Sequence, residues 1–230
     1  MDKEEKVNKT DVTIETYNNI VEEYVGYFKT KDLNGNVQFQ KEMDYIISEL
    51  KDGAVILDAG TATGEYPKYL TEKCSKKFRV IGIDAAKNMI EVAKNNALKA
   101  EFMVMDVRNL EFSKEMFDVI ICFATLIHID DDESLKVLNQ FDFILKKDGL
   151  IAINVMEFKN NNKEFFENEP FNPKYKTYFN RYSRDFFVDY FSNKGYEILK
   201  FIDNSLLNPE KINGQMADDN QFSIIVRKNR

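Results

Sequence analysis

The chain has 230 residues, 43% of them hydrophobic and 31% charged, which describes one globular domain that needs no disulfide or metal to stabilise its core. Its 32 basic and 39 acidic residues give a formal net charge of -7, whereas nucleic-acid-binding proteins normally show a basic surplus. No apolar run approaches the ~18–20 residues that span a bilayer, and the charged start lacks the apolar core of a signal peptide. The two cysteines, Cys74 and Cys122, lie far apart in the sequence, which fits a reducing compartment. We therefore expect a cytoplasmic protein.

Two helices are predicted before the first strand. The first ten residues are charged and expected to be frayed. After them, apolar side chains recur at three- and four-residue spacing, which indicates an amphipathic helix. Asn34-Gly35 predicts a loop, and a second helix is expected over about residues 37–50. The apolar positions of the first helix are Ile14, Tyr17, Val21, Tyr24 and Phe28.

The middle of the chain alternates between short apolar runs and helical patterns. Continuous apolar runs are typical of strands buried on both faces, and helices between them require parallel pairing with right-handed crossovers. We therefore predict an α/β fold, a three-layer sandwich around a mostly parallel sheet. The strands are expected near residues 54–57, 79–83, 102–105, 117–123 and 150–155, and the helices near 64–73, 86–98 and 131–146.

The last third of the chain begins with an aromatic segment that lacks periodicity. Residues 158–182 are either part of a lid or acceptor wall, or a satellite core beneath a long insertion. A helix is predicted after Ser183, followed by strands near 196–202 and 221–226.

The segment from Val55 to Glu65 predicts a strand, a turn of small residues and a helix. Gly60 and Gly64 allow the backbone to approach a ligand closely, at the sheet edge where α/β folds bind their ligands. The G-x-A-x-G spacing, with a carboxylate directly after it, does not suit the pyrophosphate of a dinucleotide. No Gly-Lys-Ser/Thr follows, so a P-loop is excluded as well.

Three predicted strands end in an aspartate: Asp58, Asp84 and Asp106. A single aspartate there is usually a turn residue or a helix cap. Three at neighbouring strand ends, one beside a glycine turn, indicate a binding site. Asp84 lies twenty residues after Gly64, where an acidic residue in nucleoside-binding folds accepts the ribose hydroxyls.

These motifs in combination resemble the class I S-adenosylmethionine-dependent methyltransferases, most closely the small bacterial type that acts on small molecules. The resemblance implies a Rossmann-like sheet of seven strands with an antiparallel last strand, S-adenosylmethionine as cofactor and S-adenosylhomocysteine as product. It rests on Leu57-Asp58-Ala59-Gly60-Thr61-Ala62-Thr63-Gly64, Gly82-Ile83-Asp84 with Met89-Ile90, Met105-Asp106-Val107, and Phe117-Asp118-Val119-Ile120.

The resemblance also implies how one domain over residues 1–230 is divided. It implies an N-terminal helical lid (1–52), a cofactor-binding core (53–157), an acceptor-side insertion (158–182) and a C-terminal helix with strands (183–230).

Site residues follow from the resemblance position by position. Asp58 and Gly60 are expected at the methionine end, Asp84 at the ribose, Met89 against the adenine, and Asp106 at the adenine amino group. The chain departs from the family at Ala62, where glycine is usual, and this methyl group narrows the turn. The expected cofactor site also includes Tyr17 and Tyr24, which close over the cofactor, and Thr61, Gly64, Ala85, Val107 and Phe123.

The acceptor end is predicted less sharply. His128 is either a catalytic base that also contacts the acceptor or a brace for the following helix, and Tyr178 and Tyr182 are expected in the acceptor wall. The acidic run from Asp130 to Glu133 is interpreted as a helix start, and no metal site is predicted.

The predicted function is transfer of a methyl group to a nitrogen, oxygen or sulfur atom of a small molecule by in-line displacement. Alternatives are methylation of RNA or protein, which the acidic composition disfavours, and a non-catalytic protein that binds S-adenosylmethionine. We expect neither nucleic acid nor a membrane as partner, and a monomer or homodimer.

Overall fold

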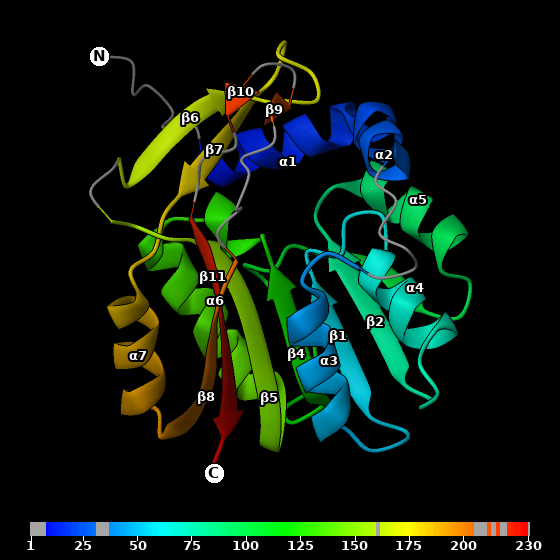
Figure 1. The fold of residues 1–230 in the computed structure, drawn as a ribbon, viewed down its shortest axis with the longest axis vertical. Helices are drawn as coiled ribbons and strands as arrows, with labels where there is room; N and C mark the ends of the chain where they lie inside the picture. Colours follow the sequence, from blue (N-terminus) through cyan, green and yellow to red (C-terminus); the bar gives the residue numbers. More distant parts are fainter. Residues whose placement is uncertain are drawn as a thin grey trace.

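The computed structural model describes residues 8–30, 37–159, 162–204, 211–212, 215–216 and 220–229. A seven-stranded sheet forms its centre, in the order β3-β2-β1-β4-β5-β11-β8 (Figure 1). The pairs among β3, β2, β1, β4 and β5 are parallel, and β11 runs antiparallel to both of its neighbours. The strands are β1 (Val55–Ala59), β2 (Arg79–Asp84), β3 (Glu101–Val104), β4 (Phe117–Phe123), β5 (Leu145–Met156), β8 (Tyr196–Asp203) and β11 (Gln221–Lys228).

Helices cover both faces of this sheet, so the predicted three-layer α/β sandwich is confirmed. One apolar cluster joins a sheet face to the helices α6 and α7, and another joins the opposite face to α3 and α4. The strand interiors are mostly apolar, as expected where both faces are covered. Buried polar exceptions include Asn154 of β5 and Ser223 of β11, which are joined by a hydrogen bond of 3.1 Å. The helices of these layers are α3 (Gln40–Glu49), α4 (Glu65–Glu72), α5 (Lys87–Asn96), α6 (Asp131–Ile144) and α7 (Arg184–Asn193).

Two helix starts confirm predictions from the sequence. The Asp130 carboxylate accepts a hydrogen bond from the backbone N–H of Glu133 at 2.9 Å and caps α6, whose first turn is acidic. Ser183 caps α7 in the same way, through the backbone N–H of Phe186 at 3.2 Å. The acidic run at Asp130 is thus a helix start.

The N-terminal region differs from the prediction in where its helix begins and which face it buries. Helix α1 (Lys9–Asn19) begins with Asn8 as its cap, so residues 8–10 are not frayed, and the chain bends at Ile20 into α2 (Val21–Thr30). The predictions for residues 1–7 and for the loop at Asn34-Gly35 fall outside the described residues. The side chains that α1 buries are three threonines, Thr10, Thr13 and Thr16.

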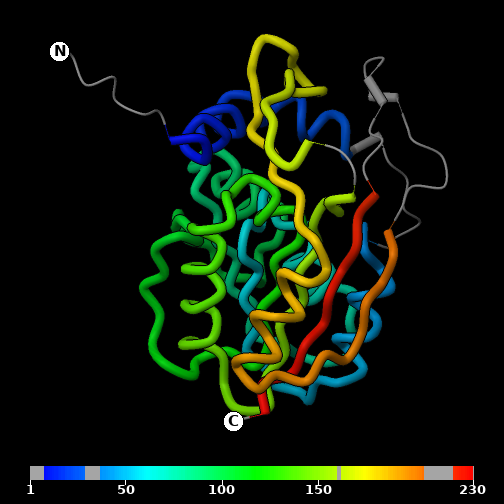
Figure 2. Tube along the Cα trace, turned by 90° about the vertical axis from the view of Figure 1, so that its left-hand side faces the viewer, coloured from blue at the N-terminus to red at the C-terminus, as the bar shows by residue number. Residues whose placement is uncertain are grey.

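Residues 158–182 contain a hairpin that the sequence analysis missed. Its strands are β6 (Glu164–Asn168) and β7 (Lys176–Asn180), and it lies beside α1 above the sheet (Figure 2). The threonines of α1 explain this position: the Thr16 hydroxyl donates to the Lys176 carbonyl at 2.7 Å, and the Thr13 hydroxyl accepts from the Tyr178 N–H at 3.1 Å. Polar side chains therefore join helix to hairpin, and hydrophobic periodicity carries no trace of such a contact.

The helices described within residues 1–52, the predicted helical lid, lie in two different places. Met43 and Ile46 of α3 are fully buried in the sheet core, so α3 belongs to the layers. Helices α1 and α2 lie over the carboxyl end of the parallel strands, with the β6–β7 hairpin beside α1 (Figure 1), and their role as a lid stays a prediction. Two short strands, β9 (Lys211–Ile212) and β10 (Gln215–Met216), pair with each other. Among the described residues, no helix has the length and apolar character needed to cross a bilayer.

Candidate functional site

A cavity of about 190 Å³ lies beneath α1, where the parallel strands end. Its floor comes from the residues that follow β1, β2, β3 and β4, and its roof comes from α1 and α2. The carboxyl ends of parallel strands are where open α/β sheets bind ligands. The lining residues are Thr10, Thr13, Ile14, Tyr17, Tyr24, Gly60, Ala62, Asp84, Ala85, Ala86, Met89, Met105, Asp106, Val107, Phe123, Ala124, Thr125, Ile127, His128 and Ile129.

Most of the residues expected at the cofactor site line this cavity. The structure brings together one set from six separate segments of the chain: Tyr17, Tyr24, Gly60, Asp84, Ala85, Met89, Asp106, Val107, Phe123 and His128. It does not bring Asp58, Thr61 or Gly64 to the lining. Their binding roles stay predictions.

Asp84 is held rigidly at the end of β2 by backbone groups. Its Oδ1 accepts from the Ala86 N–H at 2.8 Å, and its Oδ2 accepts from the Ala62 N–H at 3.0 Å. Burial raises the pKa of Asp84 to about 6 despite these hydrogen bonds. Each carboxylate oxygen keeps a lone pair for a further donor, so Asp84 can accept two hydroxyl groups from the cavity.

The turn after β1 is tightly packed against the loop after β4. Gly60 has a φ of +86°, and a Cβ there would lie 2.0 Å from the Thr125 hydroxyl oxygen, which itself donates to the Ala59 carbonyl at 3.0 Å. Only glycine satisfies both conditions. Ala62, the departure from the family pattern, has a φ of 45° and still presents its N–H to Asp84. The methyl group at Ala62 is accommodated without loss of that hydrogen bond.

Asp58 lies behind this turn and stabilises it from inside. Its side chain is 1% exposed, and its Oδ2 accepts from the Thr61 hydroxyl at 2.6 Å. Burial raises the pKa of Asp58 to about 7, with smaller contributions from the charges of Glu65 and Asp84, although the hydrogen bond from Thr61 lowers it. In this structure Asp58 orders the loop from behind the cavity lining.

His128 is oriented by hydrogen bonds at both ring nitrogens. Its Nδ1 lies 2.8 Å from the Tyr178 carbonyl oxygen, which only accepts, so Nδ1 carries the proton. Its Nε2 lies 3.3 Å from the Tyr17 hydroxyl and accepts from it. Burial lowers the pKa of His128 to about 4 and raises that of Tyr17 above its usual range. At neutral pH the cavity therefore contains a neutral imidazole with an acceptor nitrogen.

The structure does not place the side chains of Tyr178 and Tyr182, which were predicted in the acceptor wall, in the cavity lining. Tyr182 is fully buried, and its hydroxyl donates to the Ile129 carbonyl at 2.6 Å and lies 2.6 Å from the Ser134 hydroxyl. The Tyr178 ring is 1% exposed and lies outside the lining. Tyr178 acts on the site through its backbone carbonyl, which orients His128.

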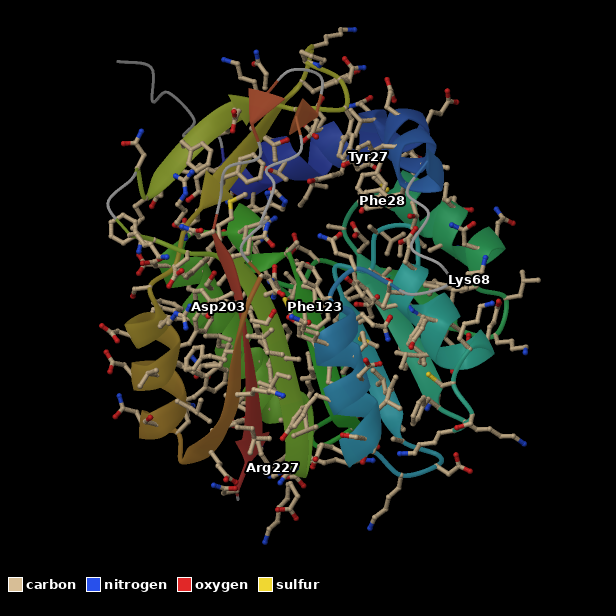
Figure 3. All side chains as sticks on the ribbon, viewed as in Figure 1. Tyr27, Phe28, Lys68, Phe123, Asp203 and Arg227 are labelled. Carbon is tan, nitrogen blue, oxygen red and sulfur yellow. The ribbon has the colours of Figure 1, made fainter. Side chains whose placement is uncertain are left out.

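Aromatic rings gather where α2 faces the sheet. Tyr24 packs on Phe28 with ring centroids 4.6 Å apart and on Phe171 of the hairpin loop at 5.5 Å. Figure 3 shows Tyr27 and Phe28 above the end of β4, where Phe123 lies in the cavity lining. The roof over this end of the cavity is thus largely aromatic.

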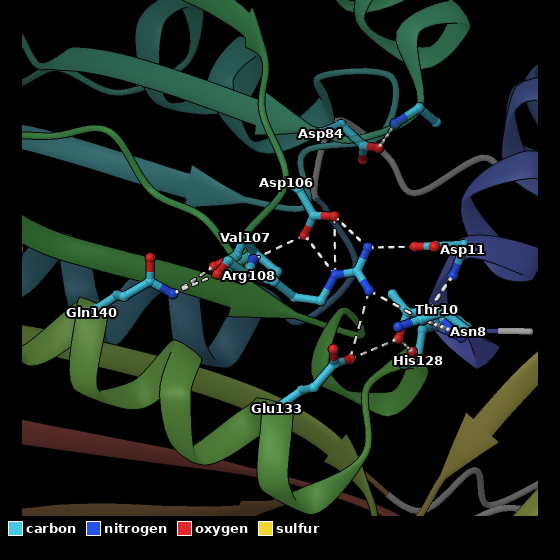
Figure 4. Close-up of polar contacts among 11 residues, drawn as sticks. Asn8, Thr10, Asp11, Asp84, Asp106, Val107, Arg108, His128, Glu133 and Gln140 are labelled. Carbon is cyan, nitrogen blue, oxygen red and sulfur yellow. Dashed lines mark hydrogen bonds and ion pairs between the residues drawn. The ribbon is translucent and has the colours of Figure 1, made fainter. Parts of the chain in front are cut away.

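Several lining residues were missed by sequence reasoning. Thr10 and Thr13 fall in or beside the segment taken as frayed, and Thr125 precedes η1 (Leu126–His128) without a motif of its own. Arg108, which lies outside the lining, was also missed. It joins Asp106 to the start of α1 (Figure 4). Small polar residues have no characteristic spacing, so nothing in the sequence marks them.

The charges around the cavity suit a cationic cofactor. Asp84 and Asp106 line it, and burial also raises the pKa of Glu65, which begins α4 beside the turn. S-adenosylmethionine carries a sulfonium and an ammonium group, which would favour the ionised carboxylates. Among the described residues, no group of three side chains is arranged to hold a metal ion.

Comparison with known proteins identifies the central part of the chain. Residues 56–149 match the model of a family described as a methyltransferase domain. The chain is 28% identical over 120 residues to the probable tRNA methyltransferase 9B of Homo sapiens, covering 52% of this chain and 25% of that protein. It is 32% identical over 132 residues to phosphoethanolamine N-methyltransferase 1 of Arabidopsis thaliana, covering 56% and 25%. The matches span about a quarter of these relatives' length.

A solved structure resembles nearly the whole chain. The magnesium protoporphyrin IX methyltransferase of Synechocystis PCC 6803, with bound S-adenosylmethionine, aligns with a TM-score of 0.70 at 14% identity and covers 98% of this chain and 100% of that one. At this identity the likeness establishes the shared fold.

Proposed function

We propose that this chain, which belongs to the class I S-adenosylmethionine-dependent methyltransferases by its domain over residues 56–149, methylates a nitrogen, oxygen or sulfur atom of a small molecule. The observation that carries the proposal is Asp84, whose carboxylate is fixed by two backbone N–H groups and lines the cavity beneath α1. Such a carboxylate is suited to the two ribose hydroxyls of the cofactor.

The remaining lining supports one direction for the bound cofactor. Met89 is suited to an aromatic base on one side of Asp84, and Gly60 leaves room for the methionine end on the other. When bound there, S-adenosylmethionine supplies a methyl group on a positively charged sulfur. Tyr17 and Tyr24 of the roof exclude water from it, and the acceptor is held within ~3–3.5 Å of that carbon for in-line attack.

We propose His128 as the base that removes the acceptor's proton. Its Nε2 is unprotonated at neutral pH and faces the cavity, and Tyr17 keeps its proton because burial raises the pKa of the phenol. With a pKa of about 4, His128 is a weak base. It suits an acceptor atom whose proton becomes acidic as the new bond forms, such as an amine nitrogen.

The position of the cavity supports a small acceptor over RNA or protein. It lies beneath α1 and α2, so a macromolecular acceptor would have to present its target group past these helices. The relative named as a tRNA methyltransferase favours the RNA alternative, and the net charge of -7 disfavours it. A salt-sensitive complex with tRNA would support that second candidate.

The cellular location is part of the proposal. The two cysteines are unpaired, with Cys122 buried, which supports a reducing compartment such as the cytoplasm. The oligomeric state, monomer or homodimer, is tested by light scattering.

The test is titration calorimetry with S-adenosylmethionine and S-adenosylhomocysteine, followed by an acceptor screen. We expect binding to wild type, and Asp84→Ala should weaken it more than tenfold, about 1.4 kcal/mol. Asp52→Ala, a change at an exposed aspartate far from the cavity, is the matched control. Absence of binding by the folded wild type would refute the function. Binding without turnover on any acceptor would support the non-catalytic alternative.

A further inference from the structure

One guanidinium joins the floor of the cavity to the start of the lid helix (Figure 4). The Nε of Arg108 lies 3.0 Å from both carboxylate oxygens of Asp106, and its Nη2 donates to Asp106 Oδ2 at 2.6 Å. The same Nη2 donates to Asp11 Oδ1 at 2.6 Å, and Nη1 donates to Asn8 Oδ1 at 3.1 Å. Asp106 lines the cavity, whereas Asn8 caps α1 and Asp11 lies in its first turn.

A third element meets the same side chain. Glu133, in the first turn of α6, places a carboxylate oxygen 3.6 Å from Arg108 Nη1, and that oxygen lies 3.5 Å from the Thr10 hydroxyl of α1. Three carboxylates thus converge on one cation whose side chain is only 18% exposed. Without this cation, Asp11, Asp106 and Glu133 would repel one another, and the repulsion would weaken the attachment of the first turn of α1 to the cavity floor.

The Asp106 carboxylate is held mainly by Arg108. Its Oδ1 also accepts from the backbone N–H of Arg108 at 2.8 Å. The four contacts come from three N–H groups, because the Nε–H is shared by both oxygens, so about one of the four lone-pair directions stays open to a donor from the cavity. The backbone of this segment is itself fixed, because the Gln140 amide donates to the Arg108 carbonyl at 3.0 Å and accepts from the Leu110 N–H at 2.7 Å. A shift of Asp106 is therefore transmitted to Arg108.

We propose that Arg108 is a positioning residue that couples occupancy of the nucleoside site to closure of α1. Ligand contact fixes Asp106, Asp106 fixes the guanidinium, and the guanidinium holds Asn8 and Asp11 so that α1 stays over the cavity. The inference rests on the proposed function, because it takes the ligand at Asp106 to be the nucleoside of S-adenosylmethionine or its product.

A purely structural tie and a coupling device differ in what the ligand changes. A structural tie stabilises α1 equally with and without ligand. A coupling device makes α1 more protected when ligand binds, and this extra protection disappears with Arg108.

The experiment measures S-adenosylhomocysteine affinity by calorimetry and hydrogen exchange of residues 9–19 with and without that ligand. In Arg108→Gln we expect about tenfold weaker binding and loss of the ligand-dependent protection of residues 9–19, with protection of residues 79–96 retained. Arg79→Gln is the matched control, because Arg79 makes an exposed ion pair with Glu101 at the opposite end of β2. It should leave affinity within twofold and lid protection unchanged.

A second variant covers the case in which Arg108→Gln does not fold. Asp11→Asn removes the lid end of the link at a side chain that is 61% exposed and leaves the contacts between Arg108 and Asp106 intact. It should reduce the ligand-dependent protection of residues 9–19 without changing the melting temperature by more than a few degrees.

The outcomes separate this inference from the proposed function. Wild type that does not bind S-adenosylhomocysteine refutes both. Wild type that binds, while residues 9–19 exchange equally fast with and without ligand, overturns the coupling alone. Full ligand-dependent protection in Arg108→Gln, or in Asp11→Asn should that variant be the one that folds, overturns it as well.

Discussion

The Nε2 atom of His128 lies 3.3 Å from the hydroxyl oxygen of Tyr17, and this contact joins the loop after β4 to the lid helix α1. The two rings also meet edge to face, with centroids 5.4 Å apart. Because Tyr17 donates to the nitrogen proposed as base, an acceptor has to replace or share that hydrogen bond when it binds. The position of α1 and the proposed proton transfer therefore depend on the same imidazole nitrogen.

We predict that His128→Gln lowers kcat by about 10²–10⁴-fold with the acceptor found by screening, because glutamine keeps hydrogen-bonding groups but takes no proton. S-adenosylhomocysteine affinity should stay within about threefold of wild type. Steady-state kinetics and calorimetry check the two parts separately.

Tyr17→Phe is the matched variant for this test. It keeps the ring over the cavity and removes a hydrogen bond of about 1 kcal/mol, so we expect a loss of turnover of less than about tenfold. Nearly full turnover in His128→Gln would refute the base and leave His128 as a brace between Tyr178 and the lid.

The pH dependence of cofactor binding follows from the buried carboxylates. Burial raises the pKa of Asp84 to about 6 and that of Asp58 to about 7, above their ordinary values. These groups bind more protons in the folded than in the unfolded protein between about pH 4 and 7. Their contribution to the free energy of unfolding is therefore fully present at low pH and is lost as pH rises through 6–7.

Cofactor binding should show the opposite trend, because a cationic ligand favours the ionised carboxylates. We predict that affinity falls as pH is lowered from 8 to 5, more steeply for S-adenosylmethionine, which carries the sulfonium charge, than for S-adenosylhomocysteine. Titration in buffers of different ionisation enthalpy measures the protons released on binding at pH 6.5. Asp84→Asn should reduce the loss of affinity between pH 7 and 5. If the variant shows the same loss as wild type, groups other than Asp84 cause the pH dependence.

Gly60 and Gly53 have the same left-handed backbone conformation, so alanine substitutions at the two positions distinguish backbone strain from steric overlap. Gly60 has a φ of +86° and a Cβ there would meet Thr125, whereas Gly53 has a φ of +81° and open space around its Cβ position. Both changes to alanine incur the left-handed penalty of about 1–2 kcal/mol. Gly60→Ala adds an overpacking cost of about 1–3 kcal/mol.

We therefore predict that Gly60→Ala lowers the free energy of unfolding by about 1–3 kcal/mol more than Gly53→Ala and weakens S-adenosylhomocysteine binding more than tenfold. Gly53→Ala should leave binding unchanged. Denaturant unfolding and calorimetry check both points. Equal effects of the two substitutions would show that the turn at Gly60 tolerates a side chain.

Residues of the sheet and of the cavity floor were predicted from the sequence because their signals are local. Apolar runs such as Phe117–Phe123 predict buried strands, and the carboxyl ends of parallel strands meet at one edge whatever else the chain does. The placement of Asp84 and Asp106 at the same cavity follows from this geometry. The strand at residues 79–83 was also predicted to end at Asp84, and β2 ends there.

The roof of the site was decided only by the tertiary structure. Thr13 and Thr16 join α1 to a hairpin more than 150 residues away, and Arg108 joins α1 to the floor through Asp11. These contacts depend on polar pairs that are distant in sequence and have no periodicity. Tyr182, predicted at the acceptor, is instead buried with its hydroxyl satisfied, because aromatic composition does not distinguish a binding wall from a core.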